Sequence, residues 1–304
     1  MRRRDFGRFL AGAAIGGAVS GFSIEQQKNE TAAFKVSVML WTVFRELPFA
    51  ERLEKVASAG YQYVELVSEY QGWSDTEFRE VAARRQKLGI EFDAISGLKH
   101  GAAEPGVRDA FLRELTALMP IAEKLNCPAI IVLSGNRVES ISREQQHQAC
   151  IETMKRASEI AERNHVQLLL ENIDPLENPK YFLTSVAEGL EIVRTVDHKS
   201  VRFLYDFFHE QIAEGNLIAK LQKNIDLVGL VHVADVPGRH QPGTGEINYD
   251  NIYRALAALK YDRVIAMEFE PVGNAVEVLR SARQRVQKTQ TPSTVVTNRS
   301  ARSG

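Results

Sequence analysis

Four residues in the second half of the chain are of types that bind divalent metals, and each stands at or near the end of an apolar run. They are Glu171, Asp206, His232 and Glu268. The intervals between them, from 171 to 206, 206 to 232 and 232 to 268, are 35, 26 and 36 residues. Taken alone, an acidic residue at such a place is often a helix cap or an ion-pair partner. As a regularly spaced set, the four predict one shared site.

Three carboxylates that converge in a partly buried site repel one another and lose hydration. The cost is several kcal/mol unless protons or a cation neutralise them. Three oxygen donors with one imidazole favour Mn²⁺ or Mg²⁺, although Zn²⁺, Co²⁺ and Fe²⁺ also accept such ligands. We therefore predict that Glu171, Asp206, His232 and Glu268 bind one divalent metal ion.

Three further residues accompany the predicted metal ligands. His209 follows Asp206 by three residues, Arg239 lies in the loop "DVPGRHQPGTGE", and Glu65 stands in the apolar run "YVELV". A histidine can donate a hydrogen bond, and an arginine provides a fixed positive charge, to the oxygen atoms of a polar substrate. A helix-capping histidine and a surface arginine are the alternatives. We predict that His209, Arg239 and Glu65 bind substrate.

The elements that carry these residues follow one repeating pattern. Short runs rich in Val, Ile and Leu alternate with longer stretches whose apolar positions have helical spacing. The runs begin at Phe34, Tyr63, Ile90, Ala129, Val166, Val201, Leu227 and Val264. Eight strand-helix units over about 250 residues are typical of an α/β fold, the (β/α)8 TIM barrel, whose active site lies at the carboxyl ends of the strands. No GxGxxG follows the first run, which argues against a doubly wound dinucleotide-binding fold.

Charge and cysteine content narrow the partners. The chain has 304 residues, of which 38 are basic and 39 acidic, so its net charge of -1 indicates no nucleic acid partner. A small molecule is the expected ligand. The two cysteines, Cys127 and Cys150, do not have metal-binding spacing and are expected to be buried thiols. A homo-oligomer is compatible with these features.

The two ends of the chain differ from the predicted barrel of residues 34–287. Residues 1–23 combine a basic start with a short apolar stretch, and "RRDF" from Arg3 resembles a twin-arginine export signal. Residues 24–33 are predicted to be a linker and residues 288–304 a disordered tail. We expect export to the periplasm, with the cytoplasm as the alternative. The apolar stretch is too short to span a bilayer, so stable membrane insertion is not expected after signal cleavage.

Four motifs give the sequence a family resemblance. They are "LLLENI" with Glu171, "YDFFHEQ" with Asp206 and His209, "HVADVPGRHQPGTGEINY" with His232 and Arg239, and "AMEFEP" with Glu268. Together they resemble the hydroxypyruvate isomerase family of xylose-isomerase-like TIM barrels, whose relatives include ketose 3-epimerases and endonuclease IV. The resemblance is closest over residues 164–271.

The resemblance implies an aldose-ketose type isomerisation through an enediolate. It implies that the four ligands hold one divalent ion and that Glu171 and Glu268 move the proton between adjacent carbons. Metal-assisted polarisation of the substrate oxygen and proton transfer by a carboxylate are compatible steps. For hydroxypyruvate the product would be tartronate semialdehyde, and Arg239 could hold the substrate carboxylate.

Other functions remain open for the same set of residues. A ketose 3-epimerase or sugar isomerase could use the same metal site, and a sugar-binding barrel without catalytic activity could share the fold. An endonuclease IV-like activity is disfavoured, because the chain has seven histidines in all and a balanced charge. The loop "GLKHGAAEPGVRD" after the third strand is shorter than the segment we associate with hydroxypyruvate isomerases, so the substrate itself stays open.

Overall fold

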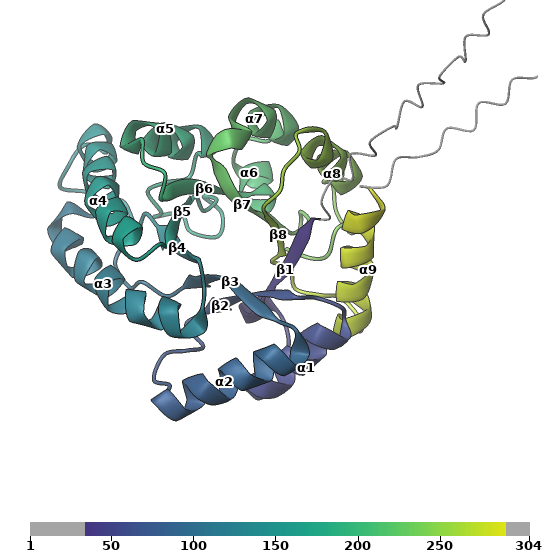
Figure 1. The fold of residues 1–304 in the computed structure, drawn as a ribbon. Helices are drawn as coiled ribbons and strands as arrows, with labels where there is room; N and C mark the ends of the chain where they lie inside the picture. Colours follow the sequence, from purple (N-terminus) through teal and green to yellow (C-terminus); the bar gives the residue numbers. More distant parts are fainter. Residues whose placement is uncertain (1–33, 290–304) are drawn as a thin grey trace, which may run out of the picture. The chain divides into compact units, whose positions relative to one another are not determined.

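Eight parallel strands pair in sequence order, and the first pairs with the last, so that the sheet closes on itself (Figure 1). The computed structural model describes residues 34–289. Helices connect successive strands and surround the barrel. The predicted TIM barrel is confirmed, and each predicted apolar run contains one strand.

Within the described residues, the strands are β1 (Lys35–Met39), β2 (Tyr63–Val67), β3 (Glu91–Ser96), β4 (Ala129–Leu133), β5 (Gln167–Glu171), β6 (Val201–Asp206), β7 (Val228–Val233) and β8 (Val264–Met267). The α-helices are α1 (Phe49–Ser58), α2 (Asp75–Leu88), α3 (Arg108–Leu125), α4 (Arg143–Arg163), α5 (Val186–Val196), α6 (Phe207–Ala213), α7 (Leu217–Asn224), α8 (Tyr249–Ala258) and α9 (Ala275–Lys288). Short 3₁₀ helices lie at Leu40–Thr42, Pro105–Val107 and Ile225–Leu227.

The two faces of each strand have different surroundings. Side chains on the outer face pack against the helices in a large buried apolar core, which includes Val231 of β7 and Tyr205 of β6. Side chains on the inner face form a smaller apolar cluster inside the barrel, which includes Leu169, Leu204 and Leu230. Because successive residues of a strand alternate between faces, the residues two positions after these leucines also point inward.

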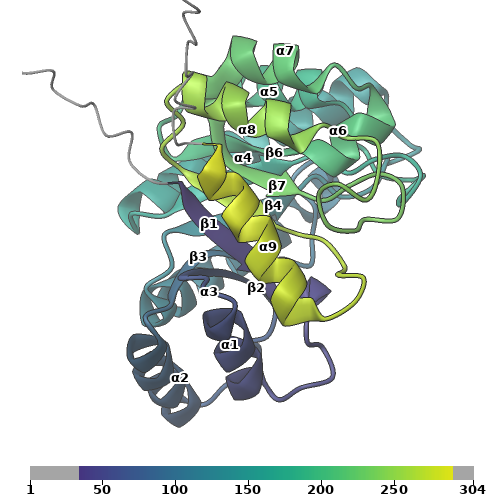
Figure 2. The ribbon, with the colours of Figure 1, turned by 90° about the vertical axis from the view of Figure 1, so that its right-hand side faces the viewer.

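The last helix, α9, packs next to the first helix, α1, and so completes the ring of helices around the barrel. Figure 2 shows α9 running between α1 and α8, and it contacts both. The Tyr61 hydroxyl, just before β2, donates a hydrogen bond to the Leu279 carbonyl in α9 at 2.9 Å. This contact joins residues 218 positions apart and holds the last helix against the first unit.

Several sequence predictions concern the chain ends. The predicted export signal at 1–23 and linker at 24–33 lie outside the described residues and stay predictions. Helix α9 continues to Lys288, which is the first residue of the predicted tail, and residues 290–304 are not described. In residues 34–289 no helix combines the length and apolarity that a membrane crossing requires. Cys127 and Cys150 are free and buried, as expected.

Substitution of Gly229 in β7 would test how tightly the interior of the barrel is packed. A Cβ atom at this position would lie 2.5 Å from Leu169 Cδ2 and 2.7 Å from Arg202 Cβ. We therefore expect Gly229→Ala to lower the free energy of unfolding by about 1–3 kcal/mol, the usual cost of overpacking. Urea denaturation measures the change. Gly106→Ala is the control, because a Cβ atom at position 106 would meet nothing within 4 Å. Equal stability of the two variants would contradict the packing argument.

Candidate metal and substrate site

Strand register brings the four predicted metal ligands to one end of the barrel. Asp206 and His232 are direct partners in the pairing of β6 with β7. Glu171 is the last residue of β5, and Glu268 continues the ladder just beyond β8, where its backbone N–H donates to the Val233 carbonyl at 3.0 Å. Two residues before each ligand stands an apolar residue of the inner cluster, so the four polar side chains rest on an apolar layer: Leu169, Leu204, Leu230 and Ala266.

The four side chains converge as the sequence predicted. Each offers one ligand atom, and these atoms all lie within 4.8 Å of one another. His232 Nδ1 is central: it lies 2.6 Å from Glu268 Oε2, 3.4 Å from Glu171 Oε1 and 4.0 Å from Asp206 Oδ2. All four residues are buried.

Three of the converging atoms make no hydrogen bond to the described residues: Asp206 Oδ2, His232 Nδ1 and Glu268 Oε2. Asp206 is also the N-cap of α6, because its Oδ1 accepts hydrogen bonds from the backbone N–H groups of Phe208 and His209. The second oxygen of the same carboxylate is thus left for another partner. Buried polar atoms are rarely left without partners. One cation bound by all three atoms would satisfy them, so the residues fit a divalent metal ion.

The charges of the cluster are strongly coupled. Burial disfavours the charged form of His232, but the carboxylates of Glu268 and Glu65 raise its pKa well above the usual value. Burial would raise the pKa of Glu268, yet Arg239 and His232 hold that pKa well below its usual range. Burial raises the pKa of Glu171, which His232 only partly offsets. The two glutamates therefore differ in basicity within one site.

Glu65 lies behind the ring of His232. It is fully buried in β2, and its Oε2 accepts a hydrogen bond from His232 Nε2 at 3.0 Å. This contact uses the ring nitrogen on the far side from the cluster and leaves Nδ1 for the other ligands. A carboxylate that receives the second nitrogen of a metal-binding histidine fixes the ring and its tautomer. The contacts of Glu65 thus favour a role in orienting His232 over the predicted contact with substrate.

Arg239 stands over the cluster, between two aromatic rings. Its guanidinium carbon lies 5.3 Å from the centre of the Trp41 ring and 4.8 Å from that of Phe208. Its Nη2 forms an ion pair with Glu268 Oε2 at 2.8 Å, and its Nη1 donates to Glu177 Oε2 at the same distance. Trp41 Nε1 also donates to Glu268, to Oε1 at 2.8 Å. The predicted substrate-binding arginine is therefore at the site, with its charge already paired.

His209 lies at the edge of the cluster. Its Nδ1 is 2.7 Å from Asp174 Oδ2, and its Nε2 is 3.4 Å from Asp206 Oδ2. Asp174 in turn accepts the backbone N–H groups of Leu176 and Glu177 through its Oδ1. Burial lowers the pKa of His209, but Asp206 and Asp174 outweigh burial and raise it. His209 thus links the loop after β5 to the metal ligands.

A buried aspartate shapes the loop that carries Arg239. Asp235 Oδ1 accepts the N–H of Ile247 at 3.0 Å, and Oδ2 accepts that of Gly243 at 2.8 Å. A Cβ at position 245 would lie 2.0 Å from the Val236 carbonyl oxygen, so only Gly245 permits this close approach. Arg239 itself has a left-handed backbone, with φ of 54°.

Sequence reasoning missed Trp41, Asp174, Glu177 and Asp235. Asp174 and Glu177 stand in "ENIDPLENP", directly after the ligand Glu171, and this position at a strand end was an available signal. Asp235 stands three residues after His232 in the same way. Nothing in the sequence around Trp41 indicates its contact with Glu268, which is 227 residues away.

Comparisons with known proteins identify the family of this chain. The family model described as xylose isomerase-like TIM barrel matches residues 53–288. This chain belongs to that family. It is 32% identical over 250 residues to the 2-oxo-tetronate isomerase of Haemophilus influenzae, covering 80% of this chain and 95% of the relative. It is 29% identical over 243 residues to the hydroxypyruvate isomerase of Escherichia coli, covering 78% of this chain and 93% of the relative.

Solved structures agree on the fold of this family member. A crystal structure titled AP endonuclease, family 2, from Brucella melitensis matches with a TM-score of 0.73 and 25% identity, covering 81% of this chain and 96% of that one. Given its similarity to curated isomerases over nearly their whole length, the chain is an isomerase of the xylose isomerase-like family.

The role of Asp235 in this isomerase is open to a stability test. Asp235→Ala leaves the buried N–H group of Ile247 without an acceptor, and it also removes the acceptor of the N–H group of Gly243, an exposed residue. Loss of the buried bond costs about 1–3 kcal/mol, so we expect the free energy of unfolding to fall by about this amount, as measured by urea denaturation. The same substitution at exposed Asp262 is the matched control. A loss no greater than that of the control would show that Asp235 does not hold the loop.

Proposed function

We propose that this isomerase is metal-dependent and interconverts a small α-hydroxy ketone and its aldehyde isomer through an enediolate. The observation that carries the proposal is the convergence of ligand atoms from three carboxylates and one imidazole within 4.8 Å, three of them without hydrogen-bond partners. Glu171, Asp206, His232 and Glu268 would hold the ion, and Mn²⁺ and Mg²⁺ suit the donor set best. When bound, such an ion acts as a Lewis acid for the substrate oxygen that becomes negative.

Glu171 and Glu268 are the candidates for proton transfer, and their contacts suggest different roles. Glu268 is held through both oxygens, by Trp41 Nε1 and by Arg239 Nη2. Among the described residues, the one basic group within ion-pair distance of Glu171 is His232, whose Nδ1 lies 3.4 Å from Glu171 Oε1. We assign Glu171 as the base that takes the proton from the substrate carbon, because fewer cationic partners oppose its protonation. Glu268, which Arg239 and His232 keep ionised, can return the proton to the neighbouring carbon only after the proton has passed to it from Glu171.

Arg239 and His209 are the proposed substrate-binding residues. Arg239 already pairs with Glu177, whose side chain is 41% exposed, whereas Glu268 is buried. A substrate carboxylate can therefore replace Glu177 on the guanidinium without breaking the contact to Glu268. A planar guanidinium can donate two parallel hydrogen bonds to a carboxylate. This arrangement favours an acid over a neutral sugar as the substrate.

Hydroxypyruvate, with tartronate semialdehyde as its product, is our first choice of substrate. The names of the two curated relatives support small oxo acids in general, and a 2-oxo-tetronate is the second choice. A ketose 3-epimerase reaction would use the same ligands and remains the alternative. A panel of these substrates with Mn²⁺ or Mg²⁺, followed by chelator, separates the possibilities. Turnover that persists after complete metal removal would overturn the metal-dependent mechanism.

Glu171→Gln tests the assignment of the base. The amide keeps the size of the side chain but cannot accept the proton, so we expect turnover to fall at least about 100-fold, within the usual range for general base catalysis. Product formed in deuterium oxide is the second measurement. In the native enzyme, solvent deuterium is expected at the carbon that receives the proton.

The control for this prediction is Glu139→Gln, because Glu139 is exposed. Native-like turnover in Glu171→Gln would rule out Glu171 as the base. An isomerised product with no solvent deuterium would favour direct hydride transfer or a fully shielded proton over exchange at Glu171.

A further inference from the structure

A second acidic residue lies behind Glu65, on the side away from the metal ligands. Asp93 is buried in β3, and its carboxyl lies next to that of Glu65 in the paired strand β2. Its Oδ1 accepts a hydrogen bond from the Ser37 hydroxyl in β1 at 2.6 Å. Strands β1, β2 and β3 thus contribute one polar side chain each to a small group inside the barrel.

Two carboxylate oxygen atoms in this group have no hydrogen-bond donor in residues 34–289. Asp93 Oδ2 and Glu65 Oε1 are both buried, and neither has a hydrogen-bond partner among the described residues. Two ionised carboxylates in contact, without a cation, would repel strongly in this buried position. A single proton shared by the pair removes one charge and satisfies both atoms.

The contacts decide which residue keeps the proton. Glu65 Oε2 already accepts the N–H of His232, whereas Asp93 Oδ2 has no donor among the described residues. Burial, and next the charge of Glu65, raise the pKa of Asp93 well above its usual value. Asp93 is therefore the member of the pair that stays protonated.

We propose that Asp93 is a positioning residue: its carboxylic acid donates a hydrogen bond to Glu65, which fixes Glu65 on His232 Nε2 and so presents His232 Nδ1 to the metal. The inference rests on the metal site of the proposed function. In this proposal Asp93 positions Glu65, and Glu65 positions the metal ligand His232. Neither of the first two contacts substrate.

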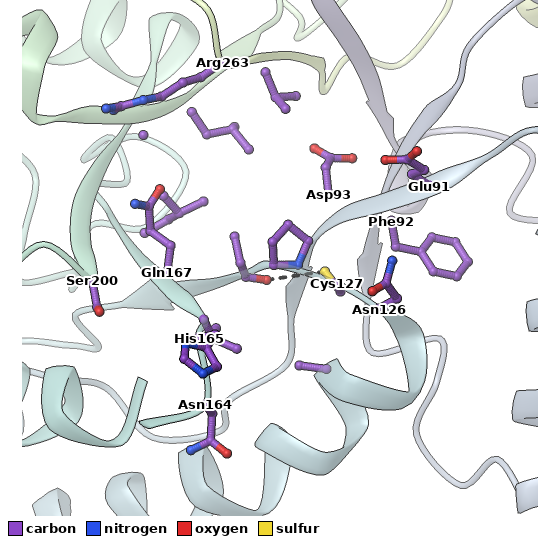
Figure 3. A pocket seen from close by; sticks show the side chains of 18 of the residues that line it. Glu91, Phe92, Asp93, Asn126, Cys127, Asn164, His165, Gln167, Ser200 and Arg263 are labelled. Carbon is purple, nitrogen blue, oxygen red and sulfur yellow. Dashed lines mark hydrogen bonds between the residues drawn. The ribbon is translucent and has the colours of Figure 1, made fainter. Parts of the chain in front are cut away.

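Asp93 is reached from the opposite end of the barrel. It lines a cavity of about 1270 Å³ whose walls include the first residues of several strands, among them Lys35, Tyr63 and Glu91 (Figure 3). These residues mark the amino-terminal end, whereas the metal ligands lie at the carboxyl end. A substitution of Asp93 therefore acts on the metal through Glu65 and His232 rather than through the substrate pocket.

Titration of the apo-protein with Mn²⁺, followed by calorimetry, tests the proposal. Asp93→Leu removes the donor, and we expect Mn²⁺ to bind at least about tenfold more weakly, the lower end of the effect of losing a group that supports a metal ligand. Asp93→Asn keeps a donor in its amide N–H and an acceptor for Ser37, so its affinity should stay within about threefold of the native value. Glu91→Gln is the control, since Glu91 lines the same cavity but is exposed.

An infrared measurement keeps the test valid if Asp93→Leu does not fold. Native protein with isotope-labelled aspartate should show the carbonyl band of a protonated carboxylic acid at neutral pH, and Asp93→Asn should lack it. Absence of this band in the native protein would overturn the inference, as would unchanged Mn²⁺ affinity in a folded Asp93→Leu variant. If the native protein itself binds no divalent ion, the proposed function fails first and this inference fails with it.

Discussion

The structure depends on how negative charge is balanced at the carboxyl end of the barrel. Three carboxylates and an imidazole rest there on an apolar layer, where water cannot disperse their charge. Removing one compensating partner from such a group leaves a buried charge without a counter-charge, which costs several kcal/mol. The surrounding contacts are consistent with this requirement: Arg239 pairs with Glu268 on one side and Glu65 receives His232 on the other.

A series of polar contacts runs from one end of the barrel to the other. From the amino-terminal cavity toward the mouth come the proposed protonated Asp93, the carboxylate of Glu65, the ring of His232, the metal ligands, and then Arg239 with Glu177. Each of these side chains contacts one on another strand or loop, so the position of one side chain restricts the position of its neighbour. A fold of eight rigid strands suits this arrangement, because strand ends hold side chains more tightly than loops do.

The sequence predicted the parts that local periodicity determines. Alternation along "LLLE" and "FLYD" places Glu171 and Asp206 on the inner face, and strand-helix repetition places all four ligands at one end. It could not predict contacts that depend on barrel closure. The bond between His232 and Glu65 joins residues 167 positions apart, and no local pattern distinguishes a glutamate beneath a histidine from one that faces substrate. The loop held by Asp235 was likewise visible only as a Gly- and Pro-rich segment.

The proposed metal ligands and the loop that carries the proposed substrate-binding residue Arg239 belong to different elements of this molecule. The proposed ligands stand on β5 to β8 or directly after them. The residue two positions before each ligand belongs to the apolar cluster inside the barrel. Arg239, Glu177 and Asp174 instead stand on the loops after β7 and β5, where backbone geometry depends on a few side-chain hydrogen bonds. Changes in those loops alter which oxygen atoms Arg239 can reach while the ligand geometry stays fixed. Under the proposed function, this division gives a physical reason why one barrel fold can keep its ligand set while its loops select different small substrates.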